Sequence, residues 1–200
     1  MHQIEPKYLF TIGAKPQQQR QPSSEPGLFN RPYGLSSNRY GHIFVADCSN
    51  NRIEIFDERG RFLRLFGRGQ PQAGNGDDQF QYPYDVSVDN HHHTQLLFVA
   101  DTYNNRVSVW SADGSQHITN VRLPSRCRGV CVDPIDCKII ASLGSWHEEK
   151  NHMVQVHDMR MLGSPSSPSS TSSCERPAHY CKHLEILIKK VHNQVDLIIQ

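Results

Sequence analysis

The sequence has little net charge, few cysteines and no long apolar run. Its 21 Lys and Arg nearly balance its 20 Asp and Glu, so a formal net charge of +1 favours neither nucleic acid nor an acidic partner. Six cysteines in 200 residues fall short of the density of a small secreted disulfide scaffold. No apolar run of about eighteen residues predicts a membrane-spanning helix, and no apolar N-terminal stretch predicts a signal peptide. We therefore expect a cytoplasmic protein without membrane contact.

Catalytic and cofactor motifs are also absent from the sequence. It contains no G-x-S-x-G, no H-E-x-x-H and no G-x-x-x-x-G-K-[ST]. The Gly-rich stretch 67–76 does not lead from a strand into a helix, as a phosphate-binding loop would. We predict no catalytic residue and no cofactor.

Three groups of histidine or cysteine raise the question of a metal site. The three histidines at 91–93 are adjacent on a predicted turn, where they cannot easily face one ion. Cys127 and Cys131 lack C-x₂-C spacing and are typical of buried thiols. The Cys and His residues within 174–183 match no familiar zinc finger. We predict no metal site.

One eight-residue motif occurs twice in the sequence. V-A-D-x-x-N-N-R at 45–52 returns at 99–106, followed each time by an apolar alternation and a Gly turn. Upstream, P-Y-G-L-S-S at 32–37 answers P-Y-D-V-S-V at 83–88. A third, weaker copy covers 123–158. Repeats of this length predict a solenoid or a propeller.

Each copy predicts four short strands joined by tight turns. Ile53, Glu54 and Ile55 alternate with the period of two that strands require. The connections are rich in Gly, Asn and Asp, which accept left-handed backbone or bond to nearby backbone groups. Repeated four-stranded antiparallel units are blades of an all-β propeller.

The repeated polar residues have a structural interpretation. Asp, Asn and Arg recur at matched positions, and the Arg stands where it can pair with the Asp across a turn. A turn needs the same groups in every blade, whereas a ligand site rarely does, so we interpret these residues as a turn network. A recurring ligand surface is the alternative interpretation. These turn residues are Asp47, Asn51, Arg52, Asp101, Asn105 and Arg106.

The pattern P-x-[GD], V-A-D-x-x-N-N-R and G-R-F-L-R-L-F-G resembles the NHL repeat, most closely the C-terminal propeller of tripartite-motif NHL proteins. This resemblance implies a six-bladed ring, of which about three blades are present (about 29–67, 80–121 and 123–158), preceded by an outer strand at 8–13. The propeller segment is then 1–160. A Ser/Pro-rich linker or insertion follows at 161–182, and an apolar tail at 183–200 fits either strands of the last blade or a helix. An incomplete ring predicts self-association.

The resemblance implies non-catalytic recognition of a protein target, as the substrate-recruiting part of a ubiquitin-ligase family member. RNA binding is the alternative, because basic and aromatic residues gather near strand ends, and a metal-dependent amidating lyase is a third reading. The Tyr residues also suit packing between blades. The candidate rim residues are Arg31, Tyr33, Arg39, Tyr82, Tyr84, Tyr103, Arg126 and Arg128.

Overall fold

The computed structural model describes one compact unit of the chain. Two units divide it, residues 1–163 and 164–200, and every described residue lies in the first. The described ranges are 7–13, 22–67, 73–90, 96–133, 135–145 and 148–159. The expected linker and apolar tail, and the histidines at 91–93, therefore lie outside the described residues.

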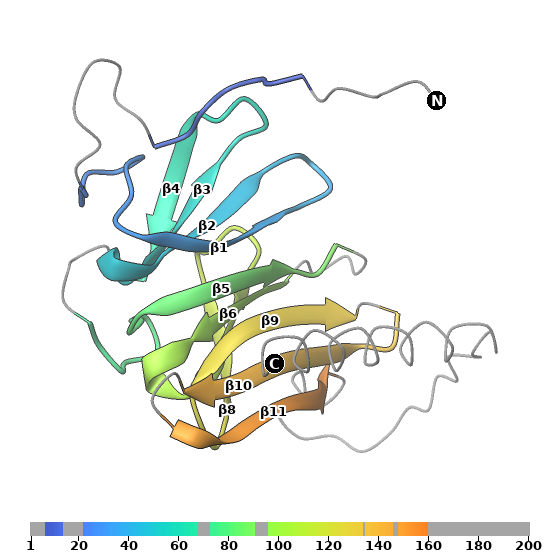
Figure 1. The fold of residues 1–200 in the computed structure, drawn as a ribbon. Helices are drawn as coiled ribbons and strands as arrows, with labels where there is room; N and C mark the ends of the chain where they lie inside the picture. The colour runs from blue at the N-terminus through green and yellow to red at the C-terminus, as the bar shows by residue number, and fades with distance from the viewer. Residues whose placement is uncertain are drawn as a thin grey trace, which may run out of the picture. The chain divides into compact units, whose positions relative to one another are not determined.

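Three antiparallel sheets make up the described fold, stacked one on the next (Figure 1). The first blade has β1 (Pro32–Ser37), β2 (Ile43–Asp47), β3 (Arg52–Phe56) and β4 (Phe62–Phe66). The second blade has β5 (Pro83–Val88), β6 (Leu96–Asp101), β7 (Arg106–Ser111) and β8 (His117–Arg122). The third sheet has β9 (Cys127–Asp133), β10 (Lys138–Ser145) and β11 (Glu148–Asp158). Strands pair in chain order within each sheet, so the prediction of an all-β, four-stranded antiparallel propeller is confirmed.

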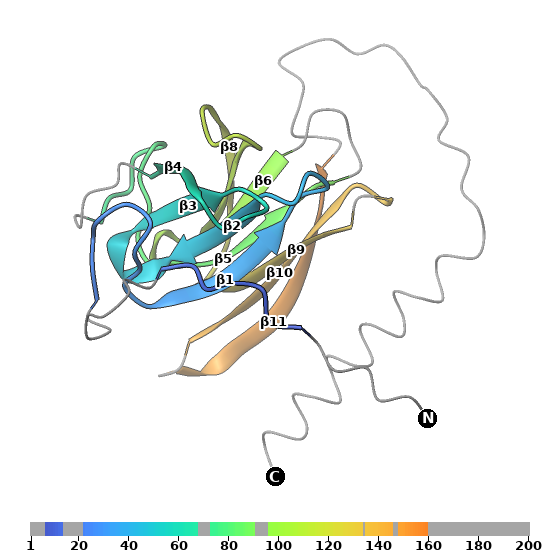
Figure 2. The ribbon, with the colours of Figure 1, turned by 90° about the horizontal axis from the view of Figure 1, so that it is seen from above.

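The first strands of the three sheets, β1, β5 and β9, lie side by side, while later strands fan outward (Figures 1 and 2). Antiparallel order places the connections of a blade alternately at its two ends. The β1–β2 turn is therefore at one end, and the β2–β3 turn is at the other, beside the start of β1. This alternation decides which candidate residues can meet.

Two apolar layers join the sheets. The layer between the first and second blades includes Phe44, Ile53, Phe80 and Trp110, all at most 4% exposed. The layer between the second blade and the third sheet is built from the opposite face of β6 and β7 and from β9 and β10. Its buried members are Phe98, Ala100, Val107, Val109, Leu123, Cys127, Val130, Ile139, Ala141 and Leu143. Each sheet thus packs through a period-two face, as the alternation in the sequence requires.

One segment differs from the sequence-based expectation, and one follows the weaker third copy of the repeat. Residues 7–13 form no strand, and Gly13 makes only an isolated parallel bridge to Leu28. The third copy shows no V-A-D-x-x-N-N-R turn in its sequence, and there β11 already begins at Glu148, which pairs with Ser145 at the end of β10. The third sheet therefore keeps the hairpin geometry of the blades without the Asp–Asn–Arg turn.

One face of the third sheet remains exposed. Val154 and Val156 on β11 are each 49% exposed, and Cys131, opposite Ile140 on β10, is exposed too. The expected self-association of an incomplete ring stays a prediction, measurable as a rise in mass with concentration by light scattering.

Candidate functional site

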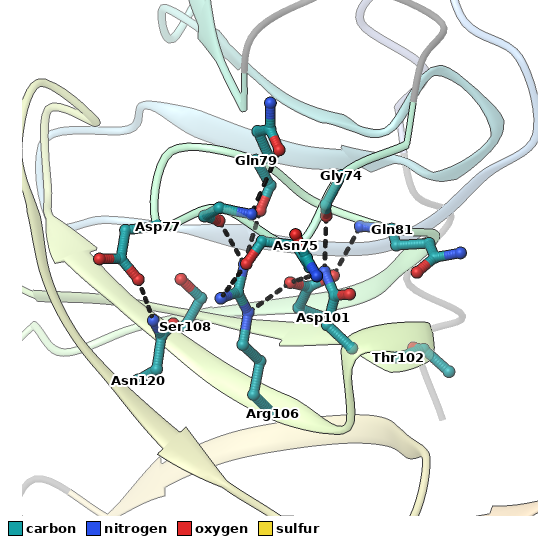
Figure 3. A network of polar contacts seen from close by, with 12 residues as sticks. Gly74, Asn75, Asp77, Gln79, Gln81, Asp101, Thr102, Arg106, Ser108 and Asn120 are labelled. Atoms are coloured by element: carbon teal, nitrogen blue, oxygen red, sulfur yellow. Dashed lines mark hydrogen bonds and ion pairs between the residues drawn. The ribbon is translucent and has the colours of Figure 1, made fainter.

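The repeated Asp–Asn–Arg residues form a buried network in each blade. In the second blade Arg106 Nε donates to Asp101 Oδ2 at 2.7 Å, and both side chains are at most 2% exposed. Asn104 donates to the same carboxylate at 2.8 Å, and the backbone N–H of Gln81 donates to Asp101 Oδ1 at 2.7 Å. Figure 3 shows the side chains of Asp101 and Arg106 meeting beneath Gly74, Asn75 and Gln79 of the connection that enters the blade. The Asp carboxylate is thus fully engaged in structure.

The same arginine holds the connection that precedes its blade. Arg106 Nη2 donates to the carbonyls of Gly76 and Gln79, at 2.8 and 2.7 Å (Figure 3). Arg52 does the same in the first blade, reaching the carbonyls of Glu25 and Leu28 at 3.0 and 2.9 Å. Each acceptor of Arg106 lies 51 residues after its counterpart, although the two connections share little sequence. Sequence comparison missed this contact because carbonyl acceptors carry no side-chain signal.

Left-handed residues close the turns of both networks. After the 3₁₀ turns η1 (Cys48–Asn50) and η2 (Thr102–Asn104), Asn51 and Asn105 have φ of 54° and 50°. Asn tolerates this region better than other side chains. Asn51 is buried and accepts the backbone N–H of Tyr82 from the next blade at 2.9 Å. Asn105 is exposed.

The first blade buries one carboxyl group more than the second. Glu54 Oε1 lies 2.6 Å from Arg52 Nη2, and Glu54 Oε2 accepts the N–H of Gly27 at 3.0 Å. Burial raises the pKa of Glu54 to about 7, the charge on Asp47 adds to the rise, and Arg52 opposes it. The second blade has Ser108 at this position, which accepts from Trp110 Nε1 at 2.9 Å. Two carboxyl groups therefore share one guanidinium in the first blade alone.

A second set of residues lies at the same end of the blades but faces solvent. The ring of Tyr33, at the start of β1, stacks on Tyr84 of β5 with centroids 4.6 Å apart and planes 26° apart. From the third sheet, the Arg128 guanidinium lies 5.4 Å from the Tyr84 centroid. Its Nε donates to the carbonyl of Gly144 at 3.0 Å. The innermost strands thus carry a column of three planar groups.

Beside this column, η2 contributes a second stack. Tyr103 lies 5.0 Å from Tyr82, centroid to centroid, and the Arg126 guanidinium lies 4.2 Å from the Tyr103 centroid. Arg31 and Tyr82, directly before the first prolines of β1 and β5, have left-handed φ of 54° and 50°. We call these seven residues the tyrosine–arginine rim: Arg31, Tyr33, Tyr82, Tyr84, Tyr103, Arg126 and Arg128.

Arg39 does not join the rim. It lies in the β1–β2 turn, at the opposite end of β1 from Tyr33, where its guanidinium lies 5.1 Å from the Tyr40 centroid. Its backbone N–H donates to Asn90 Oδ1 at 3.0 Å, linking the two blades there. The alternation of connections in an antiparallel blade separates Arg39 from the other seven candidates.

Asp85 lies at the same end of the blades and was not among the residues predicted from the sequence. It stands on β5 where β1 has Gly34 and β9 has Gly129, and a Cβ added at Gly34 would clash with Asp85 Oδ1. Its oxygens accept the N–H groups of Val86 and Val130 at 2.9 Å each. Burial raises the pKa of this carboxyl. The mismatch between P-Y-G and P-Y-D in the two copies was the available sequence signal.

Other chemistry at this end is limited. Cys48 and Cys127 are buried, and burial raises the pKa of each thiol to about 12. Among the described residues, no group of three His, Cys, Asp or Glu side chains is placed to hold a metal ion. Within the same ranges, no helix is long and apolar enough to cross a bilayer.

The chain is similar to known proteins over most of the described residues. A family described as a 6-bladed β-propeller matches residues 29–158. Protein brain tumor of Drosophila melanogaster is 31% identical over 123 residues, 57% of this chain and 11% of that protein. E3 ubiquitin-protein ligase TRIM32 of Mus musculus is 30% identical over 118 residues, covering 54% of this chain and 16% of that protein.

A third relative is named as an enzyme. A probable peptidyl-α-hydroxyglycine α-amidating lyase of Caenorhabditis elegans is 29% identical over 111 residues, 55% of this chain and 29% of that protein. The chain thus spans less than a third of the length of each of these relatives.

Proposed function

The chain belongs to the six-bladed β-propeller family, with the NHL-type repeat expected from its sequence, and on that premise we propose that it is a recognition module for a protein target. The observation that carries the proposal is the tyrosine–arginine rim. Tyr and Arg are the residues most enriched at the energetic centres of protein interfaces. Here they gather at one end of the inner strands, whereas the Asp and Arg residues that the two copies share are buried in the turns.

Rigid side chains favour this role. All rim residues except Arg31 contact one another through their rings or guanidinium groups, so binding orders few additional side chains and costs less conformational entropy. We further propose that the bound protein is a substrate for ubiquitin transfer, since one relative is named as an E3 ubiquitin-protein ligase. On this view the propeller selects the substrate, and the transfer chemistry belongs to a RING domain elsewhere.

The test is capture of proteins from a lysate by the immobilised chain. We expect a set of proteins bound by the wild type and by Arg39→Ala, and lost with the double variant Tyr33→Ala/Tyr103→Ala. RNase treatment should leave that set unchanged. The proposal is wrong if the double variant captures the same proteins as the wild type.

RNA binding is the second candidate, favoured by the adjacent Tyr and Arg side chains. Capture that disappears with RNase would favour it. The lyase reading rests on one relative's name and predicts metal retained after purification together with amidating-lyase activity. Metal analysis and that activity assay separate it from both binding roles.

A further inference from the structure

The tyrosine–arginine rim contains a three-layer stack where the second blade meets the third sheet. The ring of Tyr103 on η2 lies 5.0 Å from the Tyr82 ring, centroid to centroid, and its centroid lies 4.2 Å from the Arg126 guanidinium. Both distances are typical of favourable aromatic and cation–π pairs. Tyr103 is therefore a tyrosine side chain held between one ring and one guanidinium.

The backbone that positions this stack is repeated where the first blade meets the second. The N–H of Tyr103 donates to the Gln81 carbonyl at 3.1 Å. In the first blade, the N–H of Ser49 on η1 donates to the Asn30 carbonyl at 3.0 Å. Because the same bond holds η1 and η2 to their connections, Ser49 stands at the position that Tyr103 has in the second blade.

The side chains that flank the two positions match as well. Arg31 and Tyr82, which directly follow the two acceptor carbonyls, have nearly the same left-handed φ, 54° and 50°. Tyr103 lies between Tyr82 and Arg126 of the next sheet. By the same repeat, Ser49 lies between Arg31 and Tyr82 of the next blade. Each position is thus flanked by one ring and one guanidinium.

Two contacts place these flanking residues next to η1. The N–H of Tyr82 donates at 2.9 Å to Oδ1 of Asn51, which directly follows η1. Burial raises the pKa of Cys48 to about 12, the charge on Asp47 adds to the rise, and Arg31 opposes it. A charge has this effect only at short range, so the Arg31 guanidinium lies near the start of η1.

The position over Ser49 lacks the ring that fills its counterpart. Among the described residues, no guanidinium lies over the Tyr82 ring, and Tyr103 is the one ring that contacts it. Tyr82 is 38% exposed. The Arg31 side chain is exposed and makes no hydrogen bond, ion pair or ring contact with any described residue. A ring and a guanidinium are therefore open to a partner on the two sides of Ser49.

We propose that an aromatic side chain of the protein partner inserts over Ser49, between Arg31 and Tyr82, in the place that Tyr103 fills in the second blade. This proposal rests on the proposed recognition function and names the chemistry that the rim reads. The occupant of the matched position is a tyrosine ring, which favours an amino acid side chain over a nucleobase. Single aromatic anchors of this kind often dominate the binding energy of an interface.

The first experiment titrates the isotope-labelled, full 200-residue chain with N-acetyl-L-tyrosinamide and follows its backbone amide signals by NMR. We expect saturable shift changes that are largest at Arg31, Ser49 and Tyr82. N-acetyl-L-leucinamide, which is apolar but has no ring, should bind about fivefold more weakly, because it cannot stack on a ring or a guanidinium.

One substitution fills the position without removing anything that flanks it. Ser49→Tyr gives the first blade the residue of the second, on a backbone that already carries Tyr103, and should weaken the tyrosine probe about fivefold by occupying its place. Gln116→Tyr is the matched control. It adds a tyrosine at an exposed residue of the β7–β8 turn, at the other end of the blade from η2, and should leave the affinity unchanged.

A second variant keeps the test decisive if Ser49→Tyr does not fold. Tyr82→Gly removes the ring and suits the left-handed backbone, and it should also weaken the tyrosine probe about fivefold. The proposal is wrong if no saturable shift appears at these amides, if the leucine probe binds equally well, or if both variants keep the wild-type affinity. Adenosine monophosphate is the third probe, and its tighter binding at the same amides would assign the position to a nucleobase.

Capture from a lysate separates this proposal from the recognition function on which it rests. We expect Ser49→Tyr to lose the proteins that the wild type and Gln116→Tyr capture. If Ser49→Tyr keeps them while Tyr33→Ala/Tyr103→Ala loses them, recognition stands and the aromatic insertion is wrong. If both of these variants keep them, the recognition function itself is wrong.

Discussion

The first and second blades hold the connection that precedes them with the same buried residues, but their turns carry different residues where the chain faces solvent. Both bury an Asp–Arg pair that holds the preceding connection. Within the same turns, the half-buried Ser49 of one blade stands where the other blade has the exposed Tyr103. The comparison teaches that the shared Asp–Arg pair builds the blade, whereas the position of Ser49 and Tyr103 differs between the blades and contributes to the rim in the second blade only.

One buried difference interrupts this rule. Glu54 adds a second carboxyl group to the first network, and the second network has Ser108 there. The two blades therefore allow a direct comparison of a buried arginine paired with one carboxyl group, Arg106, and one paired with two, Arg52. The four predictions that follow compare the buried turns of the two blades with each other and with exposed residues, from the largest effect to the smallest.

The shared arginines should dominate stability. Arg106→Ala leaves the Asp101 carboxylate buried without its cation and frees the connection that Arg106 holds, so we expect a loss of about 3–5 kcal/mol in unfolding free energy. Arg122→Ala, at an exposed position on β8, should change it by less than about 0.5 kcal/mol. Urea denaturation followed by circular dichroism measures both. Comparable losses would contradict the structural role of the buried arginine.

Glu54 should make the first blade sensitive to pH. Its pKa is about 7 in the folded chain against an ordinary 4.5, so the folded state binds more protons between these values, and stability falls as pH rises through 7. The loss between pH 5 and 8 should be about 1–3 kcal/mol. Glu54→Gln should flatten this slope, whereas Glu58→Gln, at an exposed carboxyl, should leave it intact. A slope unchanged by Glu54→Gln would rule out this assignment.

The two turn asparagines should differ in their contribution to stability although both occupy the same position of V-A-D-x-x-N-N-R. Asn105→Ala places Ala in left-handed backbone and should cost about 1 kcal/mol. Asn51→Ala also removes the acceptor of the Tyr82 N–H and should cost about 2 kcal/mol. Glycine relieves the backbone strain only, so Asn105→Gly should be nearly neutral and Asn51→Gly should still destabilise. Denaturant midpoints of the four variants test this, and equal costs at both positions would refute it.

Rim contacts should contribute least to stability. Tyr103 is 40% exposed, and its contact with Arg126 is a cation–π pair in solvent. A double-mutant cycle of Tyr103→Ala and Arg126→Ala should give a coupling of about 0.5–1 kcal/mol. A coupling above about 3 kcal/mol would mean that the rim belongs to the core rather than to a binding surface.

The strands and turns of the two blades could be predicted from the sequence, because period-two patterns and turn residues are local features. The Asp47–Arg52 pairing could be proposed from the repeat alone. The stacking of Tyr33 on Tyr84 could not, since it depends on how far one sheet is displaced along the next. Arg39 was grouped with the rim because spacing alone does not say at which end of a blade a turn lies, although counting the alternating connections does.

The left-handed backbone of Arg31 and Tyr82 makes these two positions costly for stability. Both residues hold left-handed φ directly before a proline, a conformation in which glycine would cost less. A laboratory selection for heat resistance alone should therefore replace these two side chains with glycine and discard part of the rim. A selection that retains both residues would be selecting for something other than a stable fold.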